Sequence, residues 1–416
     1  MIWREVQLGD GLHVKHGFAF RGEHFSPAGE YLVLTPGNFL EAGGFRVRDG
    51  KERFYHADFP EEYLLSENDL VVAMTEQGEG LLGSAARIPS VGKYLHNQRL
   101  GLVKITDSEL LDKKFLYWIF NSADVRGQIR ATATGAKVKH TAPERIKKVR
   151  LKVPDISAQR AIAWVLDSYD DLIATNQRRI TLLEDTARRL YREWFVHLRF
   201  PGHESVPVKD GVPQGWHKTP ISEQTSLLTR GISPKYDDSA KGRVINQKCI
   251  REGKLSMQPA RRQSKELKPD RQIQVGDVLI NSTGAGTLGR VAQVRVPIED
   301  CTVDTHVTIA RPLGSEWSTY FGQALLNLEY VFSEMGRGAT NQLELSRGDI
   351  GSVEIWFPPV EVCKEFDRFA WPMLEQAENL LLTNQSLTRA RDLLLPQLMA
   401  GQLDVSGIPL PDEVCA

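Results

Sequence analysis

The sequence predicts an α+β protein in which two mixed globular domains stand in tandem, each followed by a long helix. Three observations predict this fold class. The chain has 416 residues, which is too long for a single hydrophobic core. Two stretches of roughly forty residues carry heptad spacing. The short motifs that precede the first stretch also recur before the second, at an offset slightly above 200 residues.

The first domain is expected over residues 1–153. Strands are predicted at Tyr31–Leu34, Asp69–Ala73, Leu100–Ile105 and Val149–Val153, between Gly-rich turns, and one helix at Phe115–Arg130. The first long helix is expected over residues 154–197, because Ser157–Phe195 contains no Gly and no Pro, and Ser157 is its predicted N-cap.

A heptad seam runs along this first helix. Its positions follow steps of four and three without interruption, and all but one are apolar or aromatic: Ile162, Leu166, Tyr169, Ile173, Asn176, Ile180, Leu183, Ala187, Leu190 and Trp194. A Pro- and Gly-containing linker follows and leads into a second domain, so that residues 198–357 form the linker plus domain 2. Residues 358–402 are the second helix, and residues 403–416 are a C-terminal tail.

The second half repeats the first. Trp3 corresponds to Trp216, the run from Asp69 to the run from Asp277, and the strand at Val149 to that at Val353. Adding 204 to the seam gives positions of which only Asn384 and Arg391 are not apolar: Phe366, Ala370, Met373, Ala377, Leu380, Asn384, Leu387, Arg391, Leu394 and Leu398.

The two helices are therefore predicted to pair as an antiparallel coiled coil with pseudo-twofold symmetry, with one domain at each end. Asn176 and Asn384 fall near the middle of their helices, on opposite sets of seam positions. If the two side chains face each other, both amides are satisfied and the helix register is fixed.

Composition points to a soluble protein of a reducing compartment. The formal net charge is −1, 41% of residues are hydrophobic, and the four cysteines show no metal-ligand spacing. No apolar run approaches the roughly 18 residues of a membrane span, and no signal peptide is recognised, so a cytoplasmic location is expected.

Motifs for catalysis are missing from the sequence. It has no phosphate-binding loop of the Walker type and no H-E-x-x-H. Gly284-x-Gly286-x-x-Gly289 precedes a strand-like run instead of a helix, which predicts a tight β-turn and no dinucleotide site. His13 and His16 lack further ligands, so neither a catalytic nor a metal site is predicted.

Local charge is more informative than the total. Residues 126–152 hold nine Lys or Arg against one acid, and residues 230–271 hold twelve against five. One such run is ordinarily a solvated surface. Two runs at similar places in a duplicated chain favour a phosphate backbone as the partner.

Gly-, Thr- and Ser-rich loops occupy equivalent places in the two halves. Thr75–Ser84 corresponds to Asn281–Arg290, and Ala131–Thr141 to Gly336–Gln342. Side chains in them that pair with base edges are the candidate DNA contacts, although for each one an ordinary surface role is about equally expected. The candidates are Gln77, Lys137, Lys139, Arg290, Arg337, Asn341 and Gln342.

With this layout, the chain resembles the specificity subunit of type I restriction-modification systems (the HsdS family). The resemblance is carried by Val149–Phe195 with its continuation Leu-Arg-Phe-Pro-Gly, by Gly338-Ala-Thr-Asn-Gln, and by Leu393–Leu403. It spans nearly the whole length but is weak inside the domains. The chain departs from the family pattern in two ways. The acid-Gln pair that often opens such helices is Ala158-Gln159 in the first helix and Val362-Cys363 in the second. Pro372 lies near the first turns of the second helix and is expected to kink it.

The resemblance implies that each domain is a target recognition domain reading half of a bipartite double-stranded DNA site. It also implies that the paired helices set the length of the unread spacer and bind two methyltransferase subunits. Motor-nuclease subunits would then join to complete the restriction complex. S-adenosylmethionine would belong to the methyltransferase, so this chain would carry no cofactor and no active site, in a prokaryotic cytoplasm. The alternatives are a type IIB-like specificity subunit, a coiled-coil scaffold for proteins, and a DNA-modifying enzyme.

Overall fold

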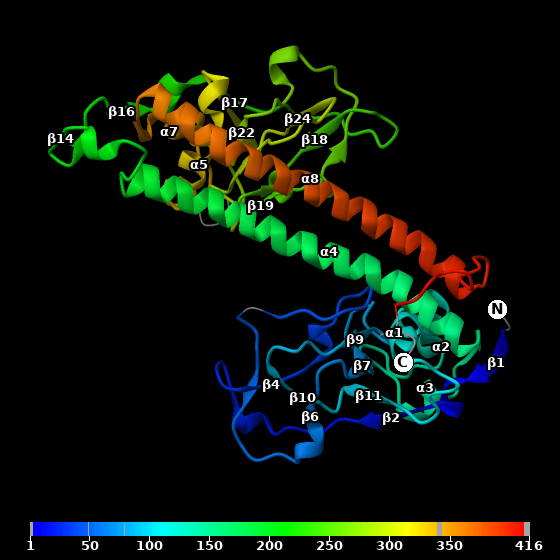
Figure 1. The fold of residues 1–416 in the computed structure, drawn as a ribbon. Coiled ribbons are helices and arrows are strands. Elements are labelled where there is room, and N and C mark those ends of the chain that lie inside the picture. Colours follow the sequence, from blue (N-terminus) through cyan, green and yellow to red (C-terminus); the bar gives the residue numbers. More distant parts are fainter. Residues whose placement is uncertain (1–2, 49, 79, 339–342, 412–416) are drawn as a thin grey trace. The chain divides into compact units, whose positions relative to one another are not determined.

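Figure 1 shows the computed structural model of the chain, which describes residues 3–48, 50–78, 80–338 and 343–411. The chain divides into two compact units: Met1–Ala174 with Gln385–Ala416, and Thr175–Asn384. Each unit contains one globular domain, the beginning of one long helix and the end of the other.

The first domain is built on a four-stranded antiparallel sheet, in which β7 is buried along its whole length. In the order β2-β11-β7-β9, the strands are Leu12–His16, Leu100–Ile105, Leu70–Ala73 and Ala85–Arg87. A smaller sheet has the order β3-β5-β4-β10-β6, with strands Phe25–Ser26, Phe54–Tyr55, Tyr31–Val33, Lys93–Leu95 and Leu64–Leu65. β1 (Arg4–Gln7) pairs with β13 (Arg150–Val153), and α3 is Pro143–Lys147.

The single helix predicted near residues 115–130 is in fact two helices. α1 (Lys113–Phe120) is capped by Asp112, whose Oδ1 accepts the N–H of Phe115 at 2.8 Å. α2 (Ala123–Ala131) is capped by Ser122. The prediction was wrong here because Ser122 competes with the helix by capping the next one, so the chain turns at this point.

The second domain repeats the four-stranded sheet and has a smaller second sheet, of three strands instead of five. Its four-stranded sheet has the order β17-β25-β22-β23, with strands Thr225–Arg230, Val307–Pro312, Val278–Asn281 and Val291–Gln293. Its small sheet has the order β21-β18-β24, with strands Arg261–Arg262, Arg243–Ile245 and Cys301–Val303. β16 (His217–Pro220) pairs with β26 (Glu354–Phe357), and the helices are α5 (Ser318–Leu326), α6 (Glu329–Glu334) and α7 (Arg347–Ser352). The parallel pair β4 and β10 recurs as β18 and β24.

Two glycines mark the same backbone crossing in both domains. A Cβ on Gly17 would lie 2.0 Å from the carbonyl oxygen of Asn97, and one on Gly231 would lie 1.9 Å from that of Val303. Only glycine permits such a close approach of two backbone segments. The duplication read from the sequence therefore extends to backbone geometry.

The β22–β23 connection bears out the predicted turn. The two strands pair antiparallel, and the Gly284–Gly289 segment between them is made of turns. The chain continues as a strand, as the sequence indicated, and so this segment is not a dinucleotide-binding loop.

The long helices are α4 (Ile156–Tyr191), extended by a π-helical turn at Arg192–Val196, and α8 (Val360–Met399). Asp155, and not Ser157, caps α4, because its Oδ1 accepts the N–H of Ala158 at 3.0 Å. α8 is continuous through Pro372 and Pro396, so neither proline ends the helix.

Each unit shows by itself that the helices run antiparallel. In the first unit, Ile162 near the start of α4 shares a hydrophobic core with Leu398 near the end of α8. In the second unit, Ala187 near the end of α4 shares one with Phe366 near the start of α8. This pairing confirms the predicted coiled coil. One seam position differs, since Leu374 is buried while Met373 is half-buried.

The two asparagines of the seam are in contact within the second unit. Nδ2 of Asn176 donates to Oδ1 of Asn384 at 2.9 Å, and the residues are 3% and 6% exposed. In the first unit Arg391, the charged seam residue, pairs with Asp170 at 2.5 Å. The polar seam residues are thus partnered between the helices.

Candidate nucleic-acid interface

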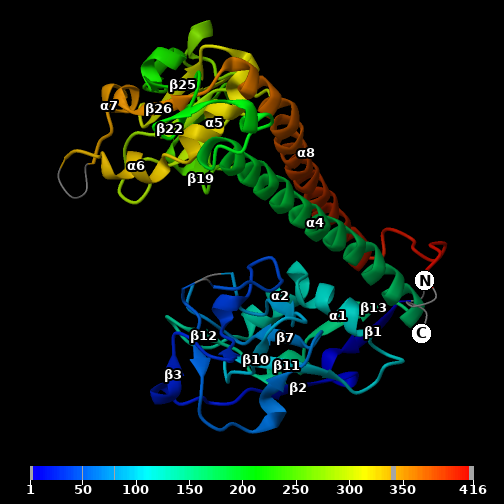
Figure 2. The same ribbon diagram turned by 60° about the vertical axis from the view of Figure 1, so that its left-hand side comes forward.

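Two loops of the first domain lie side by side (Figure 2). β8 (Thr75–Glu76) pairs with β12 (Lys139–His140), with Glu76 opposite Lys139. The segment before β12 forms a hairpin, because the backbone N–H groups of Thr134 and His140 each donate to the other's carbonyl, at 2.9 and 2.8 Å. The two segments that the sequence named as loops therefore form one surface.

In the second domain, the segment between α6 and α7 contacts the β22–β23 loop in the same way. Glu344 forms β-bridges with both Thr283 and Arg337. The backbone N–H groups of Arg337 and Glu344 each donate to the other's carbonyl at 2.9 Å. The paired segments 337–338 and 343–344, called the second hairpin below, thus pack against the β22–β23 loop, as the first hairpin packs against the loop that follows β7.

One further backbone contact repeats between the domains. The N–H of Thr141 donates to the carbonyl of Met74 at 2.9 Å, and the N–H of Leu345 donates to the carbonyl of Ser282 at 2.9 Å. These contacts use only main-chain atoms. They fix both hairpins independently of the side chains that the loops carry.

A buried carboxylate organises the first loop. Glu76 is 4% exposed, and its Oε2 accepts the N–H groups of Gly80, Leu81 and Leu82 at 3.1, 3.0 and 2.8 Å. Arg130 of α2 lies 3.8 Å from the same oxygen. A carboxylate that accepts several backbone N–H groups is strongly held, so Glu76 fixes the backbone of Gly80–Leu82 before any ligand arrives.

Part of the first basic run supports these loops instead of facing solvent. Arg126 donates to two loop carbonyls, one of them that of Gly80. Arg145 donates to the carbonyl of Thr132 at 2.8 Å and to Oγ1 of Thr134 at 3.1 Å. The count of basic residues in the sequence therefore overstates the positive charge that is free to meet a phosphate.

The three candidates of the first domain lie on the joined loops. Gln77 is exposed and directly follows Glu76. Lys137 is exposed within the hairpin, and Lys139 is half-buried on β12. Neither lysine makes an ion pair with another residue that the structure describes.

The candidates of the second domain differ in role. Arg290 is half-buried, and its Nη2 donates to the carbonyl of Gly286 at 2.8 Å, so it closes the turn. The Arg337 side chain is 82% exposed and lies 3.1 Å from Asp349. Asn341 and Gln342 lie outside the described residues.

Sequence reasoning missed a side chain that anchors the second hairpin. Arg230 forms an ion pair with Glu344 at 2.6 Å and donates to the carbonyl of Leu345 at 2.8 Å. Oγ1 of Thr283 and Nδ1 of His306 lie 2.6 Å apart beside it. One feature of the sequence pointed to Arg230, because it directly precedes Gly231, the glycine of the backbone crossing. Its partner Glu344, however, is more than a hundred residues away.

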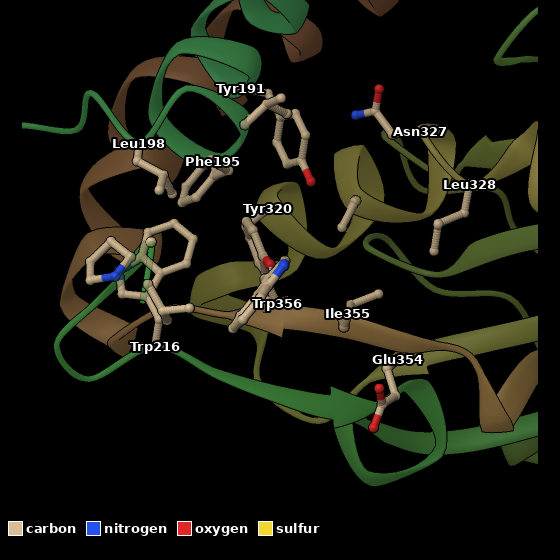
Figure 3. Close-up of a pocket in the computed structure, with 15 residues that line it drawn as sticks. Tyr191, Phe195, Leu198, Trp216, Tyr320, Asn327, Leu328, Glu354, Ile355 and Trp356 are labelled. Carbon is tan, nitrogen blue, oxygen red and sulfur yellow. The ribbon is translucent and has the colours of Figure 1, made fainter. Parts of the chain in front are cut away.

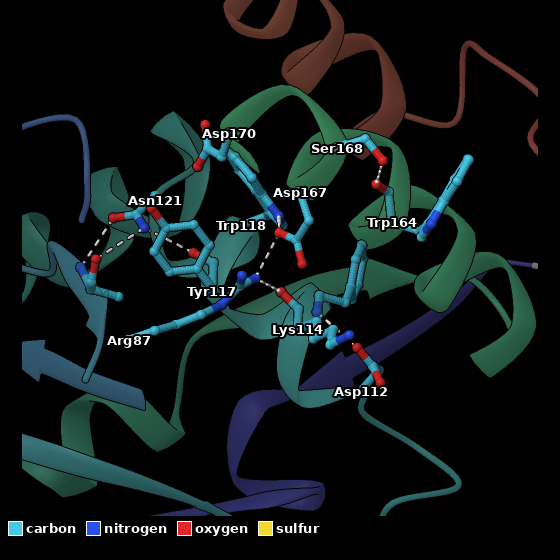
Figure 4. A network of polar contacts seen from close by, with 12 residues as sticks. Arg87, Asp112, Lys114, Tyr117, Trp118, Asn121, Trp164, Asp167, Ser168 and Asp170 are labelled. Atoms are coloured by element: carbon cyan, nitrogen blue, oxygen red, sulfur yellow. Dashed lines mark hydrogen bonds and ion pairs between the residues drawn. The ribbon is translucent and has the colours of Figure 1, made fainter. Parts of the chain in front are cut away.

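Polar contacts fix the first domain to the helices (Figure 4). Oδ1 of Asp167 on α4 accepts from Nη2 of Arg87 at 2.9 Å and from Nε1 of Trp118 at 2.8 Å. Asp170, one turn further, pairs with Arg391 of α8, and burial raises the pKa of its carboxyl group. β9, α1 and both long helices therefore meet at one polar cluster.

The second domain has a counterpart. Glu184 on α4 lies 3.4 Å from Arg295 and 2.7 Å from Lys254. Arg295 follows β23 as Arg87 ends β9, the equivalent strand. In each unit, an arginine beside the sheet thus binds a carboxylate of α4.

An aromatic hollow of about 360 Å³ lies beside the end of α4 in the second unit (Figure 3). Its walls include Tyr191, Phe195, Trp216, Tyr320 and Trp356. Burial raises the pKa of the Tyr191 and Tyr320 phenols, which stay neutral. The lining offers Glu354 as its one carboxylate, without a second acid, a histidine or a cysteine nearby on the wall, so it has the character of a packing hollow.

Reactive groups elsewhere are few. Cys249, Cys301 and Cys363 are free and buried, and burial raises the pKa of Cys249 to about 11 and of Cys301 to about 12. Among the described residues, no group of three or more His, Cys, Asp or Glu is placed to hold a metal ion. Within the same residues, no helix is both long and apolar enough to cross a bilayer.

Comparison with known proteins agrees with this geometry. The family model of the type I restriction modification DNA specificity domain matches residues 2–185. The specificity subunit of the type I restriction enzyme MjaIX of Methanocaldococcus jannaschii is 24% identical over 79% of this chain and 78% of its own length. That of HindI of Haemophilus influenzae is 19% identical over 62% of this chain and 70% of its own length.

The chain is thus similar to type I specificity subunits, and its first 185 residues match the model of their DNA specificity domain. The fold agrees, since the crystal structure of the type I restriction-modification S subunit from M. genitalium superposes with a TM-score of 0.66 at 16% identity, over 96% of each chain. The matching family model and these relatives are all of type I, so a type IIB-like specificity subunit is not favoured. The family model covers only the first module, but the second repeats the order of its four-stranded sheet and the parallel pair of its small sheet.

Proposed function

We propose that this chain is the DNA-recognition subunit of a type I restriction-modification system, with each domain reading one half of a bipartite, asymmetric site. The observation that carries the proposal is the joined pair of loops. The same main-chain contacts hold it in both domains, while the side chains on it differ. A common scaffold with different side chains is what two readers of different half-sites need.

The chemistry of these side chains suits base edges. The amide of Gln77 can pair bidentately with adenine, and the guanidinium of Arg337 with guanine. Each such pair contributes about 1–3 kcal/mol of discrimination against the wrong base. Because main-chain hydrogen bonds and Glu76 hold the loops, little ordering entropy is lost when DNA binds.

The helix pair is proposed to set the length of the unread spacer. α4 has 36 residues and α8 has 40, so their axes are about 54 and 60 Å long at about 1.5 Å per residue. Buried contacts between Asn176 and Asn384 fix the register of the pair. A rigid pair of fixed register would act as a ruler.

The remaining activities are proposed to reside in partner subunits. Two methyltransferase subunits would dock on the helices and use S-adenosylmethionine to methylate adenine, and motor-nuclease subunits would complete the restriction complex. The related proteins are named specificity subunits of type I restriction enzymes, which supports this division of labour. The chain itself would contribute recognition and no chemical step.

The test is to map methylated adenines in a host that carries the partner genes with or without this chain. We expect one bipartite sequence to be methylated only when the chain is present. Gln77→Ala should weaken or relax the first half-site alone, and Arg337→Ala the second half-site alone. Lys209→Ala, an exposed lysine on the linker strand β14 (Val208–Lys209), is the matched control and should leave the pattern unchanged.

Three results would contradict the proposal. Methylation could be the same without the chain, the assembled complex could show no sequence-selective shift in gels of varied salt, or the purified chain alone could methylate or cut DNA. The second result would indicate a protein scaffold, and the third an enzyme.

A further inference from the structure

The two domains differ sharply in the charge around their small sheets. Residues 231–273 of the second domain contain eleven Lys or Arg and five Asp or Glu. The equivalent residues 17–65 of the first domain contain five Lys or Arg and eight Asp or Glu, so the expectation that the basic runs 126–152 and 230–271 occupy similar places was wrong. Both segments contribute to a small sheet with the same central parallel pair, β4 with β10 and β18 with β24, although the first sheet has five strands and the second three.

Most of this positive charge has no carboxylate partner among the described residues, although Lys265 donates to the carbonyl of Ser233 and Arg262 to that of Ala240. Arg251, Lys254 and Arg271 pair with carboxylates. The other eight basic side chains of the segment form no ion pair with any residue in the described part of the chain, and all are exposed: Lys235, Lys241, Arg243, Lys248, Arg261, Arg262, Lys265 and Lys268. Unpaired surface charge at this density creates a field that attracts anions.

One of these groups is held in a defined position. The guanidinium carbon of Arg261 lies 3.5 Å from the centre of the Tyr236 ring, and Tyr236 is 44% exposed. Stacking on an aromatic face lowers the freedom of the guanidinium while leaving its N–H donors open. The guanidinium of Arg261 therefore faces solvent in one defined position instead of many.

The backbone beneath the lysines is also fixed. The buried amide of Gln263 donates to the carbonyl of Lys265 at 3.0 Å and accepts its N–H at 2.7 Å. The N–H of Ser264 donates to the carbonyl of Lys235 at 2.9 Å. We call Lys235, Arg261 and Lys265 the basic strip.

The basic strip is continuous with the base-reading surface. Arg230 binds the end of the second hairpin through Glu344, and the chain from Arg230 to Tyr236 leads directly to the strip. Six residues span at most about 20 Å, which equals roughly six base-pair steps of 3.4 Å. A duplex read by the hairpin would pass within reach of the strip.

We propose that the basic strip binds the phosphate backbone of double-stranded DNA and makes the second domain the electrostatic anchor of the complex. The first domain, with an acidic excess at the same place, has no such anchor and depends on its loops. This inference rests on the proposed function, and it adds that the two half-sites are held unequally. The strip positions DNA and reads no base.

The test compares two triple variants of the full chain assembled with its methyltransferase partner. Lys235→Gln, Arg261→Gln and Lys265→Gln together remove the strip. Arg21→Gln, Lys51→Gln and Arg53→Gln together remove three exposed charges from the equivalent region of the first domain, including Arg53 above the Phe25 ring. Affinity for a target duplex and for a non-target duplex is measured from 50 to 200 mM salt.

Each phosphate contact contributes about 0.9 to the slope of log affinity against log salt. The slope of the strip variant should therefore be smaller by about 2.7. Between 50 and 200 mM salt, the wild type should then lose roughly 40-fold more affinity than the strip variant. The ratio of target to non-target affinity should stay within about twofold, because phosphates carry no sequence information. The control variant should keep the wild-type slope.

The outcomes separate the two proposals. A wild-type complex without preference for the target would overturn the proposed function. A wild type with that preference, but a strip variant with an unchanged slope or a control with an equal loss, would overturn the anchor. Loss of partner assembly by the strip variant in size-exclusion chromatography would also overturn it, by showing that the strip docks protein.

Discussion

At the scale of the residue, Asn176 and Asn384 show how one polar layer serves a helix pair. Each is nearly fully buried, and a hydrogen bond from Asn176 to Asn384 joins them. A buried amide without a partner costs about 1–3 kcal/mol, whereas a matched pair costs little. A shifted register would bury each amide against an apolar residue, so the pair penalises wrong registers more than it stabilises the right one.

A double-mutant cycle tests this layer. Asn176→Leu or Asn384→Leu alone should lower the free energy of unfolding by about 1–3 kcal/mol, because one amide stays buried and unpaired. The double variant should recover most of that loss in chemical denaturation while methylating sites with less uniform spacers. Gln177→Leu, exposed on the neighbouring position, is the control. Equal losses in single and double variants would show that the amides do not act together.

The seam and this pair could be predicted because heptad spacing is a local property of the sequence. The loops could be predicted because they recur at equivalent places. The work of Arg126 and Arg230 could not, since each binds a carbonyl that is distant in sequence, at Gly80 and Leu345. Arg290 was placed in the right loop, but its hydrogen bond to Gly286 depends on a turn geometry that composition does not reveal.

At the scale of the element, capping explains most departures from prediction. Asp155 starts α4, and Ser122 starts a second helix where one was expected. α8 continues through two prolines because packing of the seam offsets the hydrogen bond that each proline removes and its clash with the preceding turn. Element type was thus predictable from periodicity, whereas element ends depended on single side-chain contacts.

Inserting one heptad into α4 and one into α8 tests the ruler. Seven residues add about 10 Å to each helix and preserve the seam, so the preferred spacer should lengthen by about three base pairs. Methylation mapping of the double insertion gives the readout. Insertion into one helix only should abolish activity, since the Asn176–Asn384 register is lost. An active double insertion with the original spacer would refute the ruler.

At the scale of the whole molecule, duplication has preserved topology while the two copies acquired opposite chemical character. Both domains keep the four-stranded sheet, the glycine crossing and the joined loops. The first domain buries His96, and burial lowers its pKa to about 4. In the second unit, Asp367 of α8 is half-buried against the start of α5, and this burial raises its pKa to about 6.

These two groups predict opposite responses to acid. His96 binds a proton less readily when folded, so its contribution is complete above pH 6.5 and is lost as pH falls. Asp367 binds a proton more readily when folded, so its contribution is present at low pH and is lost as pH rises through 6. From pH 7.5 to 5, the first domain should lose about 2 kcal/mol and the second unit gain about 1 kcal/mol from these groups.

Hydrogen exchange, corrected for the intrinsic effect of pH on exchange rates, would follow each domain separately. Protection in the first domain should fall relative to the second on acidification, and His96→Gln and Asp367→Asn should each remove its own part of the change. Parallel responses in both domains, or variants that keep the wild-type pH profile, would contradict this assignment.

The main-chain anchoring of the two hairpins has a consequence for how such a protein changes over generations. Hydrogen bonds from Thr134, His140, Arg337 and Glu344 run through backbone atoms, which every residue except proline provides. The main-chain atoms of each loop therefore stabilise its conformation, while its side chains would determine which bases it reads. A side-chain substitution in the loop can change the DNA sequence that is read while the main-chain hydrogen bonds stay in place. New specificities can therefore arise by successive substitutions, each of which leaves the protein folded.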